Sequence, residues 1–228
     1  MTRGATEALQ ALIGGYNKLK PGDTVLYADL DYSEMKNAMR WLEKRRGVKA
    51  VKLTFPEPTA DKPLAEQDIL SFYEKALSAN PGTKLLLLTH LNNWTGLIIP
   101  VARISKMARE RGVEVILDAA HSVGQVDLKL NALGCDFIGV NLHKWVGAPI
   151  GCGVIYIKKD RIDEIDPYMG KPSVSRGHQR SHRHWNSEFR RAHGDTGRHC
   201  LSQQDRHRSQ RRTPEISQKP LGRTTPGK

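Results

Sequence analysis

Short apolar runs alternate with longer stretches of helical periodicity along the first 170 residues. Four segments place apolar side chains at the three- and four-residue spacing of an amphipathic helix, namely 5–19, 33–46, 65–79 and 100–111. The apolar runs that predict strands are 24–28, 48–53, 85–89, 113–117, 137–140 and 153–157. Strands that alternate with helices are typical of an α/β domain with a mostly parallel sheet and flanking helices. We predict that fold class for residues 1–170.

The alternating pattern stops after about residue 170. Residues 171–228 contain only 8 hydrophobic residues among 58. A segment of that composition cannot bury enough apolar surface to offset the entropy lost on ordering. We therefore expect a disordered tail over 171–228 in place of a second domain.

The positive charge of the chain belongs almost entirely to this tail. The net charge is +12, and residues 171–228 carry 14 Lys and Arg against 4 Asp and Glu. Such a balance indicates a nucleic-acid or membrane partner when it describes a folded surface. Here the charges are scattered and form no recognised module, so we expect no specific nucleic-acid partner. A coding region read out of frame would give such a tail; a genuine basic tail that binds nucleic-acid phosphates is the alternative.

Several classes of protein are not indicated by the sequence. No run approaches the roughly 18 apolar residues of a membrane span. The N-terminus lacks the apolar core and cleavage site of a secretory signal. Cys135, Cys152 and Cys200 form neither a disulfide framework nor a CxxC metal pair. We expect a cytoplasmic protein without a membrane partner and without a metal site.

Polar side chains follow three of the predicted strands. Asn93 comes after strand 85–89, Asp118 follows strand 113–117, and Lys144 follows strand 137–140. Ligands of α/β sheets gather at the carboxyl ends of strands. A pyridoxal-phosphate enzyme needs a lysine for the Schiff base and a carboxylate that keeps the pyridine nitrogen protonated. Each residue alone is a cap or a solvated charge; together they favour a cofactor site.

The segment Arg3-Gly4-Ala5-Thr6-Glu7 opens the first predicted helix. Free backbone amides and the helix dipole make such a position an anion site, to which the Thr6 hydroxyl adds a donor. The alternative is an ordinary capping role for Thr6 without any ligand.

These motifs resemble the aminotransferase class V family of fold-type I pyridoxal-phosphate enzymes, in its isopenicillin N epimerase-like and cysteine desulfurase-like branches. The resemblance covers about residues 1–170, as the large cofactor-binding domain of that family. The motifs that carry it are Arg3-Gly4-Ala5-Thr6-Glu7-Ala8, Asp29-Leu30-Asp31-Tyr32, Thr89-His90-Leu91-Asn92-Asn93-Trp94-Thr95-Gly96, Asp118-Ala119-Ala120-His121 and Asn141-Leu142-His143-Lys144-Trp145.

For the cofactor's phosphate, the resemblance implies four residues. Ala5 and Thr6 would hold it through backbone amides and the hydroxyl, and Asn141 and His143 would complete the cup. His143 could equally be a structural histidine.

For the cofactor's ring, the resemblance implies five residues. Tyr32 would stack on the ring, and Asn93 and His121 would lie at its phenolic oxygen. Asp118 and Lys144 keep the roles given above, so the predicted catalytic residues are Lys144, Asp118 and His121. Tyr32 could instead be a packing aromatic, and His121 a cap.

As to function, the resemblance implies a homodimeric enzyme acting on an amino acid or its derivative through a Lys144 Schiff base. Transamination, epimerisation and C–S lyase chemistry share these residues. Trp145 is interpreted as packing. Family members have a longer N-terminus and a C-terminal small domain, so the chain looks truncated. The alternative is a non-catalytic truncated or frameshifted remnant of such an enzyme.

Overall fold

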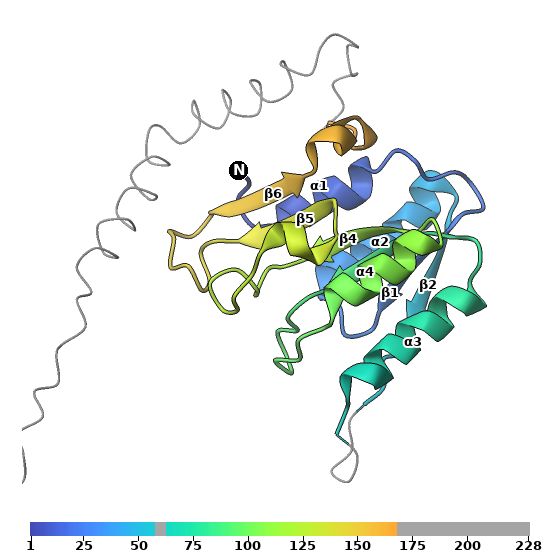
Figure 1. Cartoon of the computed structure of the whole chain (residues 1–228). Helices are drawn as coiled ribbons and strands as arrows, with labels where there is room; N and C mark the ends of the chain where they lie inside the picture. Colours follow the sequence, from blue (N-terminus) through green and yellow to red (C-terminus); the bar gives the residue numbers. More distant parts are fainter. Residues whose placement is uncertain (58–62, 168–228) are drawn as a thin grey trace, which may run out of the picture. The chain divides into compact units, whose positions relative to one another are not determined.

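The protein is built on one six-stranded sheet (Figure 1). The computed structural model describes residues 1–57 and 63–167, so the predicted tail and its boundary at residue 170 lie outside the described residues. The strands are β1 (Thr24–Ala28), β2 (Lys49–Leu53), β3 (Thr83–Thr89), β4 (Glu114–Asp118), β5 (Phe137–Asn141) and β6 (Gly153–Ile157). Their order is β2-β1-β3-β4-β5-β6, with the first five parallel and β6 antiparallel to β5.

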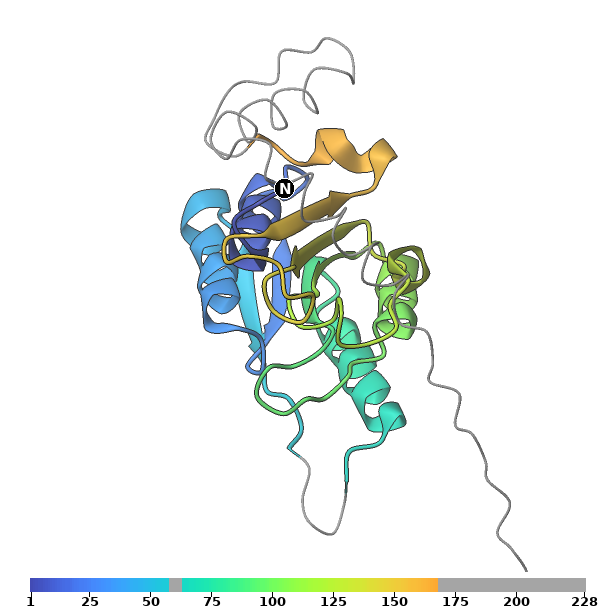
Figure 2. The ribbon, with the colours of Figure 1, turned by 90° about the vertical axis from the view of Figure 1, so that its left-hand side faces the viewer.

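Helices cover both faces of the sheet (Figures 1 and 2). The α-helices are α1 (Ala5–Gly15), α2 (Ser33–Arg46), α3 (Glu66–Ala79) and α4 (Val101–Glu110), and the 3-10 helices are η1 (Leu130–Leu133) and η2 (Lys159–Glu164). Helices α1 and α2 pack on one face, and α3 and α4 on the other, each with its own hydrophobic core. Among the described residues, no helix is long and apolar enough to cross a membrane.

Strand β3 shows why the central strands are apolar throughout. Leu85 and Leu87 point into the core beneath α1 and α2, whereas Leu86 and Leu88 point into the core beneath α3 and α4. All four side chains are fully buried. A strand with helices on both faces has no solvent side, so its sequence is a continuous apolar run. The predicted α/β fold with a mostly parallel sheet is confirmed.

The first helix is shorter than its apolar spacing predicts, ending at Gly15 instead of residue 19. At Gly15 an added Cβ would lie 2.7 Å from the backbone oxygen of Asp166, so only glycine allows this approach. The Gly15 carbonyl accepts a hydrogen bond from the Asp166 amide at 2.7 Å, and the Asn17 amide donates to the Glu164 carbonyl at 2.9 Å. Pairing with the segment after η2 therefore replaces the last helical turn.

The strand order reverses between β1 and β3: from β1 the chain continues to β2 on one side, and from β3 it continues to β4 on the other. The chain leaves β1 into α2 on one face and leaves β3 into α4 on the other. The loops after these two strands therefore diverge, and a crevice opens outside the carboxyl edge of the sheet at such a point. This is the edge at which the polar motifs were expected.

Candidate functional site

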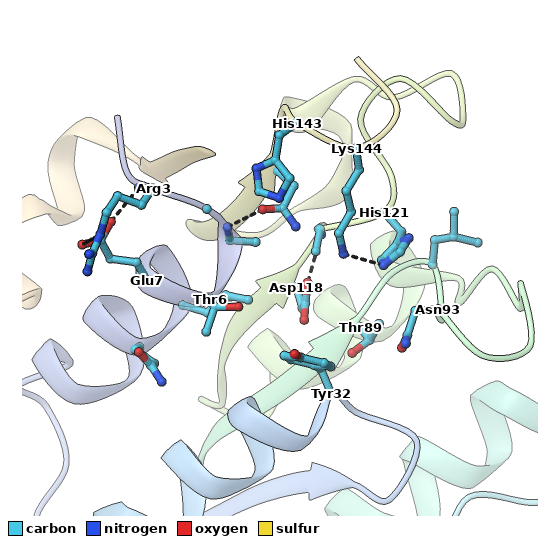
Figure 3. A pocket seen from close by; sticks show the side chains of 17 residues that line it. Arg3, Thr6, Glu7, Tyr32, Thr89, Asn93, Asp118, His121, His143 and Lys144 are labelled. Atoms are coloured by element: carbon cyan, nitrogen blue, oxygen red, sulfur yellow. Dashed lines mark hydrogen bonds and ion pairs between the residues drawn. The ribbon is translucent and has the colours of Figure 1, made fainter. Parts of the chain in front are cut away.

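A pocket of about 530 Å³ lies at this carboxyl edge (Figure 3). Its size is within the range of small-ligand sites, roughly 300–1,000 Å³. The structure brings together all nine predicted site residues in its lining, namely Ala5, Thr6, Tyr32, Asn93, Asp118, His121, Asn141, His143 and Lys144. Figure 3 shows Thr6 on one side, Lys144 and His121 on the other, and Tyr32 below Asp118.

The start of α1 forms one end of the pocket. The Ala5 amide donates a hydrogen bond to Asn141 Oδ1 at 2.7 Å, which ties the helix to the end of β5. Because Oδ1 accepts this bond, the Asn141 side-chain amide keeps its Nδ2 hydrogens for a ligand. Amides in the first helical turn have no acceptor within the helix, so those of Thr6 and Glu7 add donors for an anion.

Close backbone contacts hold this end in place. A Cβ on Gly153 would lie 2.5 Å from the Gly4 Cα, and one on Gly4 would lie 3.1 Å from Asn141 Oδ1. His143 Nδ1 lies 3.0 Å from the Cys152 carbonyl oxygen. A carbonyl only accepts, so Nδ1 carries a proton and donates it to this oxygen. The chain packs tightly around these polar groups.

Asp118 ends β4 and is the acid of the pocket. Its side chain is buried, and one carboxylate oxygen accepts from the Ala120 amide at 2.9 Å. Burial raises the pKa of Asp118 to about 6, against the lowering effects of the Ala120 amide and the Lys144 charge. The carboxylate is thus ionised at neutral pH and incompletely compensated, so it favours a cationic N–H partner.

A second buried acid lies close by. Asp31 accepts hydrogen bonds from the Thr89 hydroxyl at 2.6 Å and from the Ala28 amide at 2.7 Å. The pKa of Asp31 is raised to about 7. Burial is the main cause, the charge of Asp118 acts in the same direction, and both hydrogen bonds oppose it. Since Thr89 and Asp118 are paired in the β3–β4 register, the two acids belong to one polar group at the sheet edge.

Lys144 reaches the pocket from the loop after β5. Its Nζ lies 2.7 Å from His121 Nε2, and Trp145 Nε1 lies 3.3 Å from His121 Nδ1. Burial lowers the pKa of Lys144, opposed by the Asp118 charge. Burial, followed by the charge of Lys144, lowers the pKa of His121. An amine that loses its proton more readily than usual is a better nucleophile.

Tyr32 and Asn93 line the pocket mouth from two loops. Tyr32 precedes α2, and its ring is partly exposed beside the cavity. Asn93 follows Asn92, whose side chain accepts from the Trp94 amide at 3.0 Å and donates to the Leu30 carbonyl at 2.8 Å. The two loops that diverge from β1 and β3 are thereby fastened together.

Four polar lining residues received no role from the sequence: Arg3, Glu7, Gln10 and Thr89. Gln10 lies one helical turn after Thr6, so the spacing of four residues could have identified it. Arg3 and Glu7 form an ion pair at 3.3 Å at the helix start. Thr89 is the last residue of the predicted strand 85–89, and Asp118 directly follows the predicted strand 113–117. This position at the end of a strand could have identified Thr89.

Comparison with known proteins agrees with this arrangement. The model of the aminotransferase class-V family matches residues 1–196. Isopenicillin N epimerase from Streptomyces clavuligerus is 30% identical over 162 residues, which are 71% of this chain and 39% of that protein. The apo structure of cysteine desulfurase from Thermococcus onnurineus superposes with a TM-score of 0.63 at 25% identity, covering 75% of this chain and 40% of that one.

A third relative is a C-DES mutant with glycine covalently linked to its pyridoxal-phosphate cofactor. It superposes with a TM-score of 0.64 at 26% identity, covering 77% of this chain and 45% of that one. The chain thus spans about two fifths of the length of the curated relatives it matches. The resemblance predicted from the motifs is confirmed: the chain belongs to the aminotransferase class-V family.

Proposed function

We propose that the pocket binds pyridoxal 5'-phosphate and that the chain acts on an amino acid or amino-acid derivative through Lys144. The observation that carries this proposal is the meeting of three groups in one cavity: the N-terminus of α1, the buried Asp118 carboxylate and the Lys144 amine. Family membership supports it, because relatives include an epimerase and a desulfurase of amino-acid compounds.

The donor set fits this cofactor. Thr6 and the first-turn amides of α1, with Asn141 and His143, would hold the phosphate at one end. Asp118 would accept the pyridine N–H, and the burial that raises its pKa supports this role because a buried carboxylate is stabilised by such a partner. Bound there, the cofactor would supply an aldehyde for an amine and a ring that accepts electrons from the substrate.

The other side of the pocket would provide the reacting groups. Lys144 would supply the amine for the cofactor's aldehyde and would hold or release a proton at Nζ. His121 lies within hydrogen-bond distance of that nitrogen at 2.7 Å. Asn93 would bond the phenolic oxygen, with His121 beside it, and Tyr32 would cover the ring face.

Transamination, epimerisation and C–S lyase chemistry are the reaction types that these residues share. Names of relatives support this set: two are isopenicillin N epimerases, and others are cysteine desulfurases and cysteine desulfhydrases. We assign the chain a small amino-acid substrate from that set, with Asp118, Lys144 and His121 as its catalytic residues.

A second copy of the chain and a cytoplasmic setting complete the proposal. Ile150 is 96% exposed and Ile98 is 51% exposed, both on loops that follow strands of the carboxyl edge. The family resemblance implies a second copy of the chain, which would cover these apolar side chains if it docked at this edge. Cys135 is a buried free thiol whose Sγ lies within hydrogen-bond distance of Ser105 Oγ, at 3.0 Å. A free thiol is consistent with a reducing compartment.

The visible absorbance spectrum of the purified chain with added pyridoxal phosphate tests this function. We expect a new band in the parent and in Lys106→Ala, a control at an exposed lysine of α4, and none in Lys144→Ala. A parent spectrum identical to that of Lys144→Ala would contradict the proposal. It would leave the non-catalytic remnant as the better description.

A further inference from the structure

Trp145 contacts the same histidine as its neighbour Lys144. Lys144 Nζ lies 2.7 Å from His121 Nε2, and Trp145 Nε1 lies 3.3 Å from His121 Nδ1. The imidazole and indole rings meet edge to face, with centroids 6.3 Å apart and planes at 62°. Two consecutive residues therefore occupy both nitrogens of one imidazole ring, although the sequence had indicated only packing for Trp145.

Backbone packing holds this contact in place. Gly124, three residues after His121, has φ +87, and a Cβ there would lie 2.9 Å from the Trp145 carbonyl carbon. The loop after β4 and the loop after β5 thus touch at a point that only glycine permits. His121 and Trp145 are consequently presented to each other by two loops in direct backbone contact.

The contact with Trp145 decides where the His121 proton lies. An indole N–H can only donate, so His121 Nδ1 must accept and carries no proton. A neutral imidazole has one N–H, which is then on Nε2 and faces Lys144 Nζ. A lysine ammonium has no acceptor lone pair, so Nζ can take this hydrogen bond only as a neutral amine.

We propose that Trp145 is a positioning residue that fixes the His121 proton on Nε2 and thereby holds the Lys144 amine unprotonated. Lys144 is then kept in the form that attacks a carbonyl carbon. The inference rests on the proposed function in one respect, namely that Lys144 is the reacting amine. The proton position itself does not depend on any cofactor.

The charged groups around this trio agree with a neutral pair. Burial lowers the pKa values of both Lys144 and His121, which favours the uncharged form of each. Asp118 acts in the opposite direction on Lys144, as the lesser of the two causes. The other described charged residues that line the pocket, Arg3 and Glu7, are paired with each other at 3.3 Å.

The first test is the nitrogen-15 NMR spectrum of the full chain, without and with pyridoxal phosphate, with His121 assigned by comparison with His121→Gln. We expect Nδ1 of the cofactor-free chain to be unprotonated and Nε2 to be protonated near neutral pH. A proton on Nδ1 would overturn the proposal. If His121 carries its proton on Nε2 but the chain gives no visible band with pyridoxal phosphate, the proposed function is contradicted. The inference about the His121 proton is then still supported.

The second test is the pH dependence of reductive methylation of Lys144 by formaldehyde, followed by mass spectrometry of its peptide. Trp145→Phe keeps an aromatic ring, although a smaller one, and removes the N–H, and one hydrogen bond is worth about a fivefold to tenfold change in an equilibrium. We expect the pH profile of the cofactor-free variant to move up by about one unit, with rates converging at high pH.

A matched control is Trp41→Phe on α2, since Trp41 is 46% exposed and Trp145 is 51% exposed. This control should reproduce the parent profile. A Trp145→Phe profile identical to the parent, or slower by one factor at every pH, would show that Trp145 only packs. Should Trp145→Phe fail to fold, the tautomer measured in the parent decides alone.

Discussion

The acidic side chains at the amino ends of the strands and those at the carboxyl ends have different kinds of partner. At the amino edge, Arg161 contacts Glu114, Asp136 at 2.5 Å and Glu164 at 2.6 Å. At the carboxyl edge, Asp118 and Asp31 accept hydrogen bonds only from neutral donors, and neither has an ion pair in the described part of the chain.

This difference separates stability from function. The hydrogen bonds that Arg161 donates to the acids, that to Glu164 first, raise the pKa of Arg161, as expected of a cluster whose charges compensate one another. Burial instead raises the pKa of Asp118 to about 6 and that of Asp31 to about 7. A buried acid that is ionised without a cation costs folding free energy, and such groups are commonly found at functional sites.

Arg161→Met should have the largest effect on folding. The substitution leaves Glu114, Asp136 and Glu164 facing one another without their shared cation. Because breaking a buried ion pair costs about 3–5 kcal/mol and the Arg161 side chain keeps some exposure, we expect the free energy of unfolding to fall by about 2–3 kcal/mol. Urea unfolding followed by circular dichroism measures it.

The control for this prediction is Arg103→Met on α4. Arg103 pairs with Glu66 at 2.7 Å, but both side chains are more than half exposed. Surface pairs contribute about 0–1 kcal/mol, so the unfolding free energy should barely change. Equal losses in both variants would break the comparison, since the amino-edge cluster would then be no stronger than a surface pair.

Asp118→Asn should stabilise the fold and weaken cofactor binding. The pKa of Asp118 is raised to about 6 in the folded chain, above the ordinary value of 3.8. The protonated Asp118 carboxyl therefore contributes its full stabilisation of the fold below about pH 4, and this contribution is lost as the pH rises through 6. At pH 8 we expect the free energy of unfolding of the variant to exceed that of the parent by about 2 kcal/mol. Near pH 4 this difference should vanish.

The same variant should bind pyridoxal phosphate at least about tenfold more weakly, since a charged hydrogen bond is worth about 1.5–3 kcal/mol. Urea titrations at several pH values and absorbance titrations with the cofactor provide the two numbers. Loss of stability at pH 8, with binding unchanged, would show that Asp118 is structural like the acids of the amino edge.

Gly153→Ala should disturb the carboxyl edge by a smaller amount. Its Cβ would lie 2.5 Å from the Gly4 Cα, where backbone must move, whereas one on Gly82 would meet only Thr24 Oγ1 at 3.6 Å. We expect a loss of about 1–2 kcal/mol, with weaker phosphate binding, for Gly153→Ala. Gly82→Ala should behave like the parent. Isothermal titration with pyridoxal phosphate and thermal unfolding distinguish these outcomes.

The strands were predictable because their apolar runs are short, β-branched or leucine-rich, and bounded by turn residues. The meeting of polar residues at the carboxyl edge was predictable for the same reason, since Asp118, Asn93 and Lys144 follow such runs. The end of α1 was not, because Leu19 continues the helical spacing and stays buried although the chain has already turned at Gly15. Local periodicity does not report a distant partner such as Asp166.

Partners that are far apart in sequence explain which contacts the sequence did not reveal. The Arg161 cluster joins the starts of β4 and β5 to η2, and no local spacing relates those positions. Asp31 lay within a recognised motif, but its bond to Thr89 spans 58 residues. Trp145 looked like packing because an indole N–H has no partner that a sequence reveals.

The most direct test of the central claim is to identify the lysine that carries the cofactor. The full chain is incubated with pyridoxal phosphate, reduced with borohydride and digested, and the labelled peptides are mapped by mass spectrometry. The carboxyl-edge pocket predicts that the label lies on Lys144 and disappears in Lys144→Ala without moving elsewhere. Label scattered over the surface lysines, with no enrichment at Lys144, would contradict the account.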